Sequence, residues 1–528
     1  MTTAVAEPRQ DGQMTHREIL EMLAGLLAAL FTAIVSSTIV SNALPTIIGE
    51  LKGSQTQYTW VVTISLLTMT ITTPIWAKLS DLFNKKLLVQ LAIVLFVIGS
   101  IFAGMSTNVP MLLVFRGVQG VAMGGLTALA QSIIGSVIPP RERGRYSGYM
   151  GGVMALATVS GPLIGGIIVD TSWLGWRWCF YVCVPLAVFS LYMLQRYLHV
   201  STVRREVTID YLGAVLIAIT AGLPLIWVSF AGSSYDWLSW QTAAFLGASL
   251  VAGIGAYVQE THHREALVPI TVMRTRTTAL AIAGSLAVGI AMFGAPVFLG
   301  QYFQIARDHT PTEAGLLMIP LMLGSLVGTA GSGQFITRTG RWKNIMVGAA
   351  ALLIVGLLLL GTIDHATPLW HVSCFMVLVG IGMGGLLQNL VLAVQNTVDV
   401  TEVGAASGTV SFFRSLGGAI GVSVLGAVLA NDVKDRIATG LTGLGIDPSK
   451  ASSGSTSTLD VHALPAPVAH VVRGAYGDST SVIFLVAGIA AIVTLLSVLA
   501  IKEVPLRRTV HKAADDEPAV EAEVQHVG

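Results

Sequence analysis

Fourteen apolar stretches, each roughly 17 to 26 residues long, run through this chain of 528 residues. Helices of that length cross the ~30 Å hydrocarbon core of a bilayer. Charged residues make up only 11% of the positions and hydrophobic residues 53%, which excludes a soluble globular protein. The pattern predicts an all-α integral membrane protein with fourteen transmembrane helices. The stretches begin near residues 19, 58, 88, 111, 147, 178, 212, 241, 277, 312, 345, 370, 406 and 480.

The distribution of basic residues predicts how the helices are oriented. An even number of helices places both termini on one side of the membrane. If that side is the inside, the inner segments and the two tails hold 21 of the 30 Lys and Arg residues, and the outer segments hold seven. Cytoplasmic segments carry such an excess of Lys and Arg. We therefore expect both termini to be cytoplasmic, in a multi-pass protein of the cell inner (plasma) membrane.

The fifth apolar stretch, Gly148 to Gly166, is rich in glycine and contains Pro162. Gly148 and Gly152, and again Gly161 and Gly165, are four residues apart, a spacing that puts small residues on one face of a helix. Another backbone can approach such a face closely, and a proline is tolerated in a membrane helix where neighbouring helices satisfy the freed backbone groups. The stretch predicts a tightly packed interface that moves.

An internal repeat indicates two similar halves. GVAMGGL at positions 120–126 recurs as GIGMGGL at positions 380–386, an offset of 260 that also aligns several residues of the fifth and thirteenth stretches. Parallel repeats around a midplane site are typical of transporters whose halves rock against each other. The expected parts are a cytoplasmic tail (1–18), a six-helix bundle (19–200), two inserted helices (201–262), a second six-helix bundle (263–505) and a disordered cytoplasmic tail (506–528). A long extracellular loop (431–479) would contain a flexible linker and a short surface helix, Pro465 to Tyr476.

Several motifs resemble the major facilitator superfamily, in particular its fourteen-helix drug:proton antiporter branch. They are AKLSDLFNKK (77–86), FRGVQGVAMGG (115–125), the glycine run of the fifth stretch, WRWCFYVCVP (176–185) and FFRSLGGAIG (412–421). The resemblance implies the major facilitator fold and a secondary active exporter that takes small-molecule substrates, with the proton as coupling ion. It also implies gating roles for a set of residues: Asp81, Lys85, Lys86, Gly148, Gly152, Gly161, Pro162, Gly165 and Gly166.

Two arginines lie inside predicted spans, where each costs about 2.5 to 3.5 kcal/mol on the insertion scale. Arg116, with Gln119 one turn further, is either a cavity-facing charge that sets the proton affinity nearby or a structural tie between helices. Arg414 is either a gate or anion-binding residue or an anchor that reaches the interface. Asp81 is expected to meet the positive end of the thirteenth helix. Lys85 and Lys86 are gating residues or plain cytoplasmic anchors.

A membrane-embedded acid for proton coupling is missing at its usual place. The first-helix segment VSSTIVSNALPTI (35–47) resembles the branch pattern, but Ser36 stands where an aspartate is usual, and serine does not titrate near neutral pH. The acids nearest to the membrane are Glu21 and Asp399 at inner helix ends and Glu313 and Asp364 near outer ends. Protons could drive export through one of them, or transport could be uncoupled. Neutral groups that could line a cavity, or join helices, are Gln131, Gln388 and Asn389.

The expected function is export of hydrophobic or amphiphilic small molecules such as drugs, antibiotics or biocides. Export of one endogenous metabolite or lipid is the alternative, and a non-transporting sensor would look similar. Enzyme motifs such as GxSxG and HExxH, a nucleotide-binding loop and metal-ligand clusters are absent from the sequence. We therefore expect no catalytic activity, cofactor, metal or nucleic-acid partner, and a monomer.

Overall fold

The computed structural model describes residues 16–137, 160–198, 210–230, 235–262, 275–398, 403–446 and 464–504, with a few single positions between them. Within these ranges, the side chains of residues 16–19, 78, 81, 82, 131, 134–137, 211, 229, 337 and 403–405 are not described. Gly148 and Gly152 lie outside the described residues, as do the two expected tails apart from His16 to Glu18. The statements below refer to the described part of the chain.

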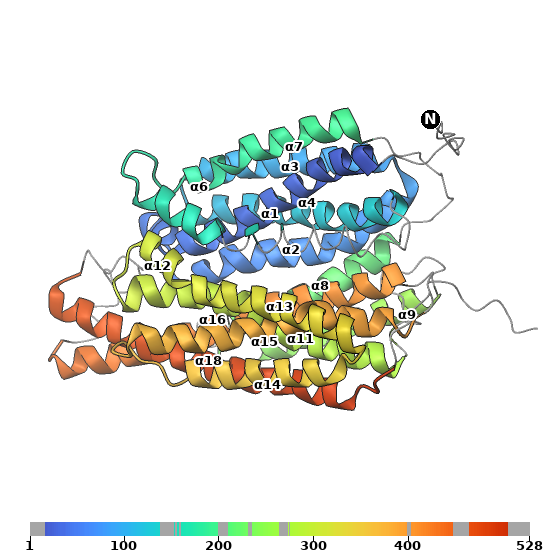
Figure 1. Ribbon diagram of the computed structural model, residues 1–528. Helices are drawn as coiled ribbons and strands as arrows, with labels where there is room; N and C mark the ends of the chain where they lie inside the picture. Colours follow the sequence, from blue (N-terminus) through green and yellow to red (C-terminus); the bar gives the residue numbers. More distant parts are fainter. Residues whose placement is uncertain are drawn as a thin grey trace, which may run out of the picture.

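The described chain is a bundle of long helices (Figure 1). Twelve of its helices are long and apolar enough to cross a membrane, and two shorter apolar helices, Ser160–Asp170 and Leu212–Val228, fall in the fifth and seventh predicted stretches. The hydropathy prediction of the spans is therefore confirmed. The first part contains α1 (His16–Glu50), α2 (Gln55–Leu82), α3 (Lys85–Gly104), α4 (Val109–Val137), helix Ser160–Asp170, α6 (Trp178–Tyr181) and α7 (Cys183–Tyr197). The second part contains α11 (Arg276–Gln301), η1 (Tyr302–Ala306), α12 (Pro311–Leu317), α13 (Ile319–Thr339), α14 (Lys343–Leu360), α15 (Leu369–Gln395), α16 (Val403–Gly443) and α18 (Ala466–Ala500).

These two parts, here the N-terminal group and the C-terminal group, repeat the same packing. The pairs α2/α4, α3/α4, α1/α7 and α3/α7 recur as α13/α15, α14/α15, α11/α18 and α14/α18. Glycines make the close contacts: a methyl group on Gly120 would lie 2.9 Å from the Ser65 Cα, and one on Gly380 would lie 2.8 Å from the Ser325 backbone nitrogen. Ser65 and Ser325 are themselves 260 residues apart, so the sequence offset reflects a real structural repeat.

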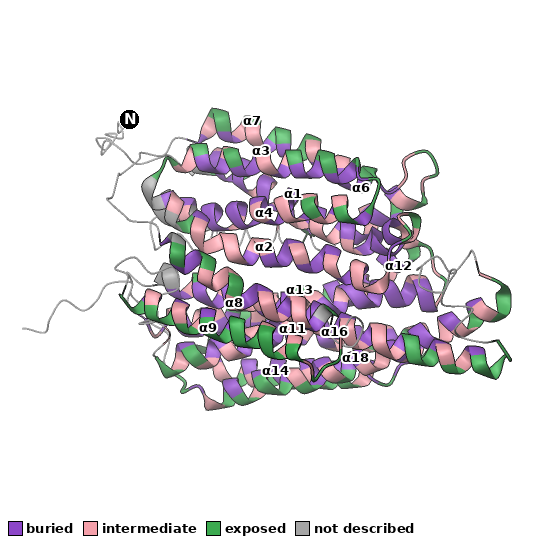
Figure 2. Ribbon diagram, turned by 180° about the vertical axis from the view of Figure 1, so that it is seen from behind, coloured by how far each residue is buried: buried purple, intermediate pink, exposed green. Residues whose placement is uncertain are grey.

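Helices α8 (Tyr211–Phe230) and α9 (Trp240–His262) pack on each other, and α8 packs against α2 and α16. Helix α9 is largely uncovered: 17% of its membrane-length window is buried, and Figure 2 shows it mostly green. Its exposed side chains are apolar and include Leu250, Val251 and Ile254. Such a surface is stable against lipid rather than water.

The chain enters α1 and leaves α18 at the same end of the bundle, here the termini end; the opposite end is the far end (Figure 1). At the far end α16 and α18 reach beyond the other helices. They have 41 and 35 residues, so at 1.5 Å per residue they are ~60 and ~50 Å long. The separate surface helix expected at Pro465 to Tyr476 does not form, because Pro465 caps the start of the continuous α18. Most of the expected linker lies outside the described residues.

Candidate functional site

Arg116 lies on α4 and is buried against α2. Its Nε donates to the Val61 carbonyl at 3.3 Å, one terminal nitrogen donates to Gln119 Oε1 at 2.9 Å, and the other donates to Ser65 Oγ at 2.9 Å. Gln119 Nε2 in turn donates to Ser100 Oγ on α3, also at 2.9 Å. Arg116 and Gln119 thus form one polar network across three helices.

The partners of Arg116 in the described residues are all neutral. Each of its three nitrogens donates one hydrogen bond, but no described carboxylate offsets its charge, and a buried charge without an opposite partner costs free energy. Such an uncompensated cation attracts an anionic group or raises the local positive potential. The network therefore fits both readings from the sequence, the structural tie and the functional charge.

Ser36 is fully buried on α1 and lies beside the thiol of Cys183 on α7. Helices α1 and α7 belong to the same group and pack along each other. The structure thus places Ser36 inside the N-terminal group, in contact with a small apolar neighbour. Its role in substrate binding or coupling stays a prediction.

The described part of the glycine run lies at the edge of the N-terminal group, between α1 and the C-terminal group. Gly161 and Gly165 face α1: a methyl group on Gly161 would collide with Thr38, and one on Gly165 would lie 2.9 Å from the Ile39 carbonyl oxygen. Gly166 faces the C-terminal group, where a methyl group would lie 2.5 Å from the Thr312 Cα. Gly315 of α12 meets Pro162 in the same way, at 2.6 Å from its carbonyl oxygen. Helix Ser160–Asp170 therefore sits in a seam with backbone contacts on both sides.

Polar side chains that the sequence analysis did not single out join the two groups at the far end. The amides of Gln55 and Gln301 bond to each other in both directions, at 3.3 and 2.6 Å, and the Tyr58 hydroxyl donates to the Val297 carbonyl at 3.1 Å. Asn42 also bridges the groups, as described below. The sequence does not show that residues almost 250 positions apart bond to each other. The one available signal was that amide side chains lie near the ends of predicted spans. The far end is closed in this structure.

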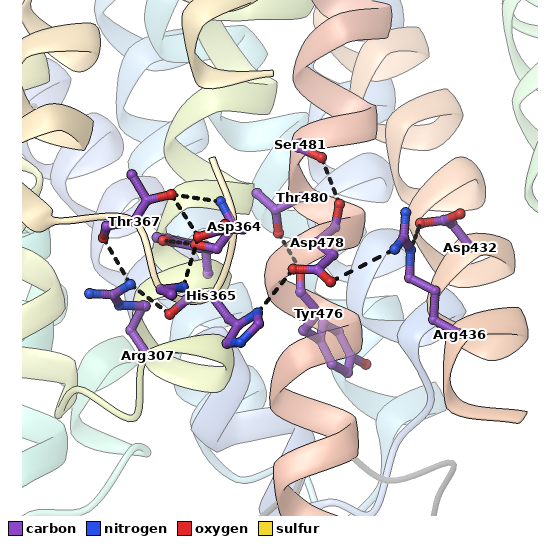
Figure 3. Close-up of polar contacts among 12 residues, drawn as sticks. Arg307, Asp364, His365, Thr367, Asp432, Arg436, Tyr476, Asp478, Thr480 and Ser481 are labelled. Atoms are coloured by element: carbon purple, nitrogen blue, oxygen red, sulfur yellow. Dashed lines mark hydrogen bonds and ion pairs between the residues drawn. The ribbon is translucent and has the colours of Figure 1, made fainter. Parts of the chain in front are cut away.

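Glu313 helps to cap a helix at the far end, and Asp364 stabilises a turn in the loop between α14 and α15. Glu313 forms a capping box with Thr310 at the start of α12 and lies 3.0 Å from His309 Nδ1, with its side chain 55% exposed. Asp364 Oδ1 accepts hydrogen bonds from the Thr367 hydroxyl and the Ala366 amide, each at 2.8 Å (Figure 3). The Thr367 hydroxyl, with the Ala366 amide, holds the pKa of Asp364 below its ordinary value.

We expect Asp364→Asn to leave the pH profile of transport unchanged across the near-neutral range. Because its pKa is lowered, Asp364 stays ionised there, and its stabilising hydrogen bonds are lost only when the pH falls through that lowered pKa. Substrate transport by wild-type and variant protein in vesicles, measured at a series of pH values, checks this. Loss of a titration step in the variant profile would show that Asp364 carries a proton.

Two further acids, which the sequence analysis did not predict as functional residues, are buried at the termini end of the inserted helices. Asp210 precedes α8, and its Oδ1 accepts from the Gly213 amide at 2.8 Å and from Gln259 Nε2 at 2.9 Å. Glu260 of α9 is close by, since a methyl group on Gly213 would collide with Asp210 and lie 3.1 Å from Glu260 Oε1. They lie at the edges of the apolar stretches, where hydropathy gives no sign of burial.

The two lysines at the start of α3 bind carbonyl groups near the ends of other helices. Lys85 Nζ donates to the Ser132 carbonyl near the end of α4 at 3.3 Å, and Lys86 Nζ donates to the Gln195 carbonyl near the end of α7 at 2.7 Å. Cations stabilise helix C-termini in this way. The side chain of Asp81 is outside the described part, so its expected contact with the thirteenth helix stays a prediction.

The polar residues of α15 and α16 are not gathered into one cluster. Arg414 is half-buried, and its closest acceptors are the Leu387 carbonyl and Ser411 Oγ, both at 3.4 Å. Asn389 is buried and donates to the Gly385 carbonyl of its own helix at 2.6 Å, whereas Gln388 is exposed. The side chain of Gln131 is not described. These residues stay candidates for substrate contact.

Residues 26–422 match the family model for the Major Facilitator Superfamily. An uncharacterized MFS-type transporter of Mycobacterium tuberculosis is 34% identical, over 98% of this chain and 74% of that protein. The multidrug transporter protein MdtP of Bacillus subtilis is 31% identical, over 84% of this chain and 81% of its own length. The efflux pump dotC of Dothistroma septosporum is 30% identical, over 92% of this chain and 84% of its own length.

Solved structures share the fold. A bacterial homolog of the human lysosomal transporter Spinster, in an inward-facing and occupied conformation, superposes with a TM-score of 0.58 at 18% identity, over 93% of this chain and 98% of that chain. The human organic anion transporter MFSD10 superposes with a TM-score of 0.54 at 12% identity, over 90% of this chain and 100% of that chain. At these identities the likeness concerns the fold alone.

Proposed function

Because this chain belongs to the major facilitator superfamily, as a multi-pass membrane transporter and not an enzyme, we propose that it exports hydrophobic or amphiphilic small molecules such as drugs, antibiotics and biocides. The single observation that supports export by alternating access is the seam at helix Ser160–Asp170. There, glycines let the backbones of the two groups touch, at Gly166 against Thr312 and at Gly315 against Pro162. Such contacts can form and separate as whole surfaces, which suits two rocking bodies.

The names of the relatives support the substrate class. The Bacillus relative is named a multidrug transporter and the Dothistroma relative an efflux pump. The sequence assigned the same class from its motifs. The proposal also places the chain in the inner (plasma) membrane as a monomer with both termini in the cytoplasm. The far end then faces outward, and the structure represents a conformation that is closed to the outside.

Protons are the proposed driving ion. One charge that crosses 100 mV provides about 2.3 kcal/mol, enough to drive uphill export. Glu313 and Asp364 are engaged in local hydrogen bonds at the far end, so we propose that Glu21 carries the proton. Glu21 is half-buried on α1 near the termini end. Its carboxyl would meet protons on the cytoplasmic side, where an antiporter releases them.

Export of one endogenous metabolite or lipid is the second candidate. The neutral surroundings of Arg116 favour it, because a pump for cationic drugs usually offers acidic groups in its cavity. An uncompensated guanidinium instead suits a neutral or anionic molecule. An anionic lipid or metabolite that competes with drug export would support this candidate.

We expect overexpression to raise resistance to several amphiphilic antibiotics or dyes, and deletion to lower it. A protonophore should abolish the difference, because it removes the proposed driving force. The measurement is a susceptibility panel on deletion and overexpression strains, with and without the protonophore. Resistance that persists with the protonophore would contradict proton coupling, and equal susceptibility of all strains would contradict drug export.

A further inference from the structure

Four amide side chains gather where the two groups meet at the far end. Asn42 of α1 and Gln55 of α2 come from the N-terminal group, and Gln301 of α11 and Gln304 of η1 come from the C-terminal group. We propose that these four residues, here the amide latch, hold the far end closed and set how often it opens. The proposal rests on alternating access, which is part of the proposed function.

Asn42 is the centre of the latch. Its side-chain nitrogen donates to the Pro162 carbonyl at 2.9 Å and to the Pro311 carbonyl at 3.0 Å. Carbonyl oxygens only accept hydrogen bonds, so the amide nitrogen, with its two donors, must point toward them. One proline belongs to the helix Ser160–Asp170 and the other starts α12. A single buried amide therefore ties the glycine-rich helix of one group to the first turn of a helix in the other.

The other amides extend this contact. Gln304 Nε2 donates to the backbone carbonyl of Asn42 at 2.7 Å, so Asn42 is bound to the C-terminal group through both its side chain and its backbone. The amide pair Gln55–Gln301 bonds in both directions, at 3.3 and 2.6 Å, and Gln301 is buried. Beside the latch, the exposed Asp170 accepts a hydrogen bond from the Thr312 amide at 2.9 Å.

Neutral amides suit a contact that must break in every cycle. An amide group is able both to donate and to accept hydrogen bonds, so when the groups separate water can replace each partner. A buried ion pair would instead leave an isolated charge behind when it broke. The carbonyls that Asn42 binds lie next to the glycines of the seam, so the latch can form only when the backbones are in contact. The latch is therefore present only in the closed conformation, and it stabilises that conformation.

The test measures the far-end distance without substrate, by electron–electron resonance between two spin labels. After Cys374→Ser, the labels are placed at Trp173→Cys and Trp370→Cys, two far-end positions with side chains 79% and 64% exposed. We expect Asn42→Ala to raise the ratio of long to short far-end distances about tenfold, which corresponds to ~1.4 kcal/mol. Ser41→Ala is the matched control, because the Ser41 hydroxyl bonds only within its own helix, to the Ser37 carbonyl at 2.9 Å.

A second pair of variants keeps the proposal testable if Asn42→Ala fails to fold. Gln301→Ala should also lengthen the far-end distance, whereas Gln90→Ala should not, because Gln90 pairs with Gln195 at 2.6 Å within the N-terminal group. Distance distributions that match those of the controls in a folded variant would overturn the latch. A lengthened distance in a protein that confers no drug resistance would uphold the latch and refute drug export. Drug resistance that depends on Asn42 without any change in the far-end distance would refute the latch and support drug export.

Discussion

Gly166→Ala is expected to reduce transport by about tenfold or more. A methyl group there would lie 2.5 Å from the Thr312 Cα and 2.6 Å from the Pro311 carbonyl oxygen, both backbone atoms of the opposite group. Backbone cannot rotate away as a side chain does, so the two groups must separate to make room. Overpacking of this kind typically costs 1 to 3 kcal/mol, which corresponds to roughly a fivefold to 150-fold shift of the equilibrium away from the closed state.

The measurement is the initial rate of substrate export from loaded vesicles, together with the far-end distance. Gly315→Ala should behave in the same way, because its methyl group would lie 2.6 Å from the Pro162 carbonyl oxygen. Gly222→Ala on α8 is the matched control, since open space surrounds that position. If Gly166→Ala transported at the wild-type rate with an unchanged distance, the seam would not be the moving interface.

Arg116→Met is expected to abolish most transport, to below about one tenth of the wild-type rate, without a matching loss of stability. Among the described residues, the hydrogen-bond partners of the buried guanidinium are all neutral. Replacement of a buried charge by an apolar side chain of similar volume often leaves the stability of a protein unchanged or raises it. A purely structural tie would give the reverse result, with lower stability and transport in proportion to folded protein. The two readings thus separate in one variant.

Thermal unfolding in detergent and export from vesicles, measured on the same preparation, check this expectation. Arg116→Lys should fail as well, because an ammonium group cannot reach acceptors on Val61, Ser65 and Gln119 in the planar arrangement of a guanidinium. Ser100→Ala is the mild control, since it removes only the outermost bond of the network. Full transport by Arg116→Met would show that the charge is tolerated rather than used.

Hydropathy predicted the spans because each had to supply its own apolar length, and the glycine repeat predicted the common packing of the two groups. The repeat also indicated close contacts within each group. Gly120 and Gly380 occupy matching positions in the two groups, and at each position only glycine lets the backbone of the neighbouring helix come so close. Arg116 and Gln119 are three residues apart on one helix, so their side chains are neighbours and bond to each other.

The contacts between the groups could not be read from the sequence. Asn42 and Pro311 are 269 residues apart, and a neutral amide carries no signal that names its partner. The far-end extensions of α16 and α18 were missed because helices outside the membrane lack a continuous apolar stretch. Ser36 was placed by analogy with an acid, but in the structure it lies beside Cys183.

Reconstituted protein gives the most direct test of proton-coupled export. Proteoliposomes that contain a pH-sensitive dye and an imposed proton gradient are given a fluorescent amphiphilic substrate, and substrate flux and internal pH are followed together. The account predicts uphill substrate movement with an opposite proton flux, and loss of both in Arg116→Met. Glu21→Gln should lose the proton flux and uphill movement but keep downhill movement. Uphill movement at constant internal pH would contradict proton coupling, and absence of any substrate flux would contradict export.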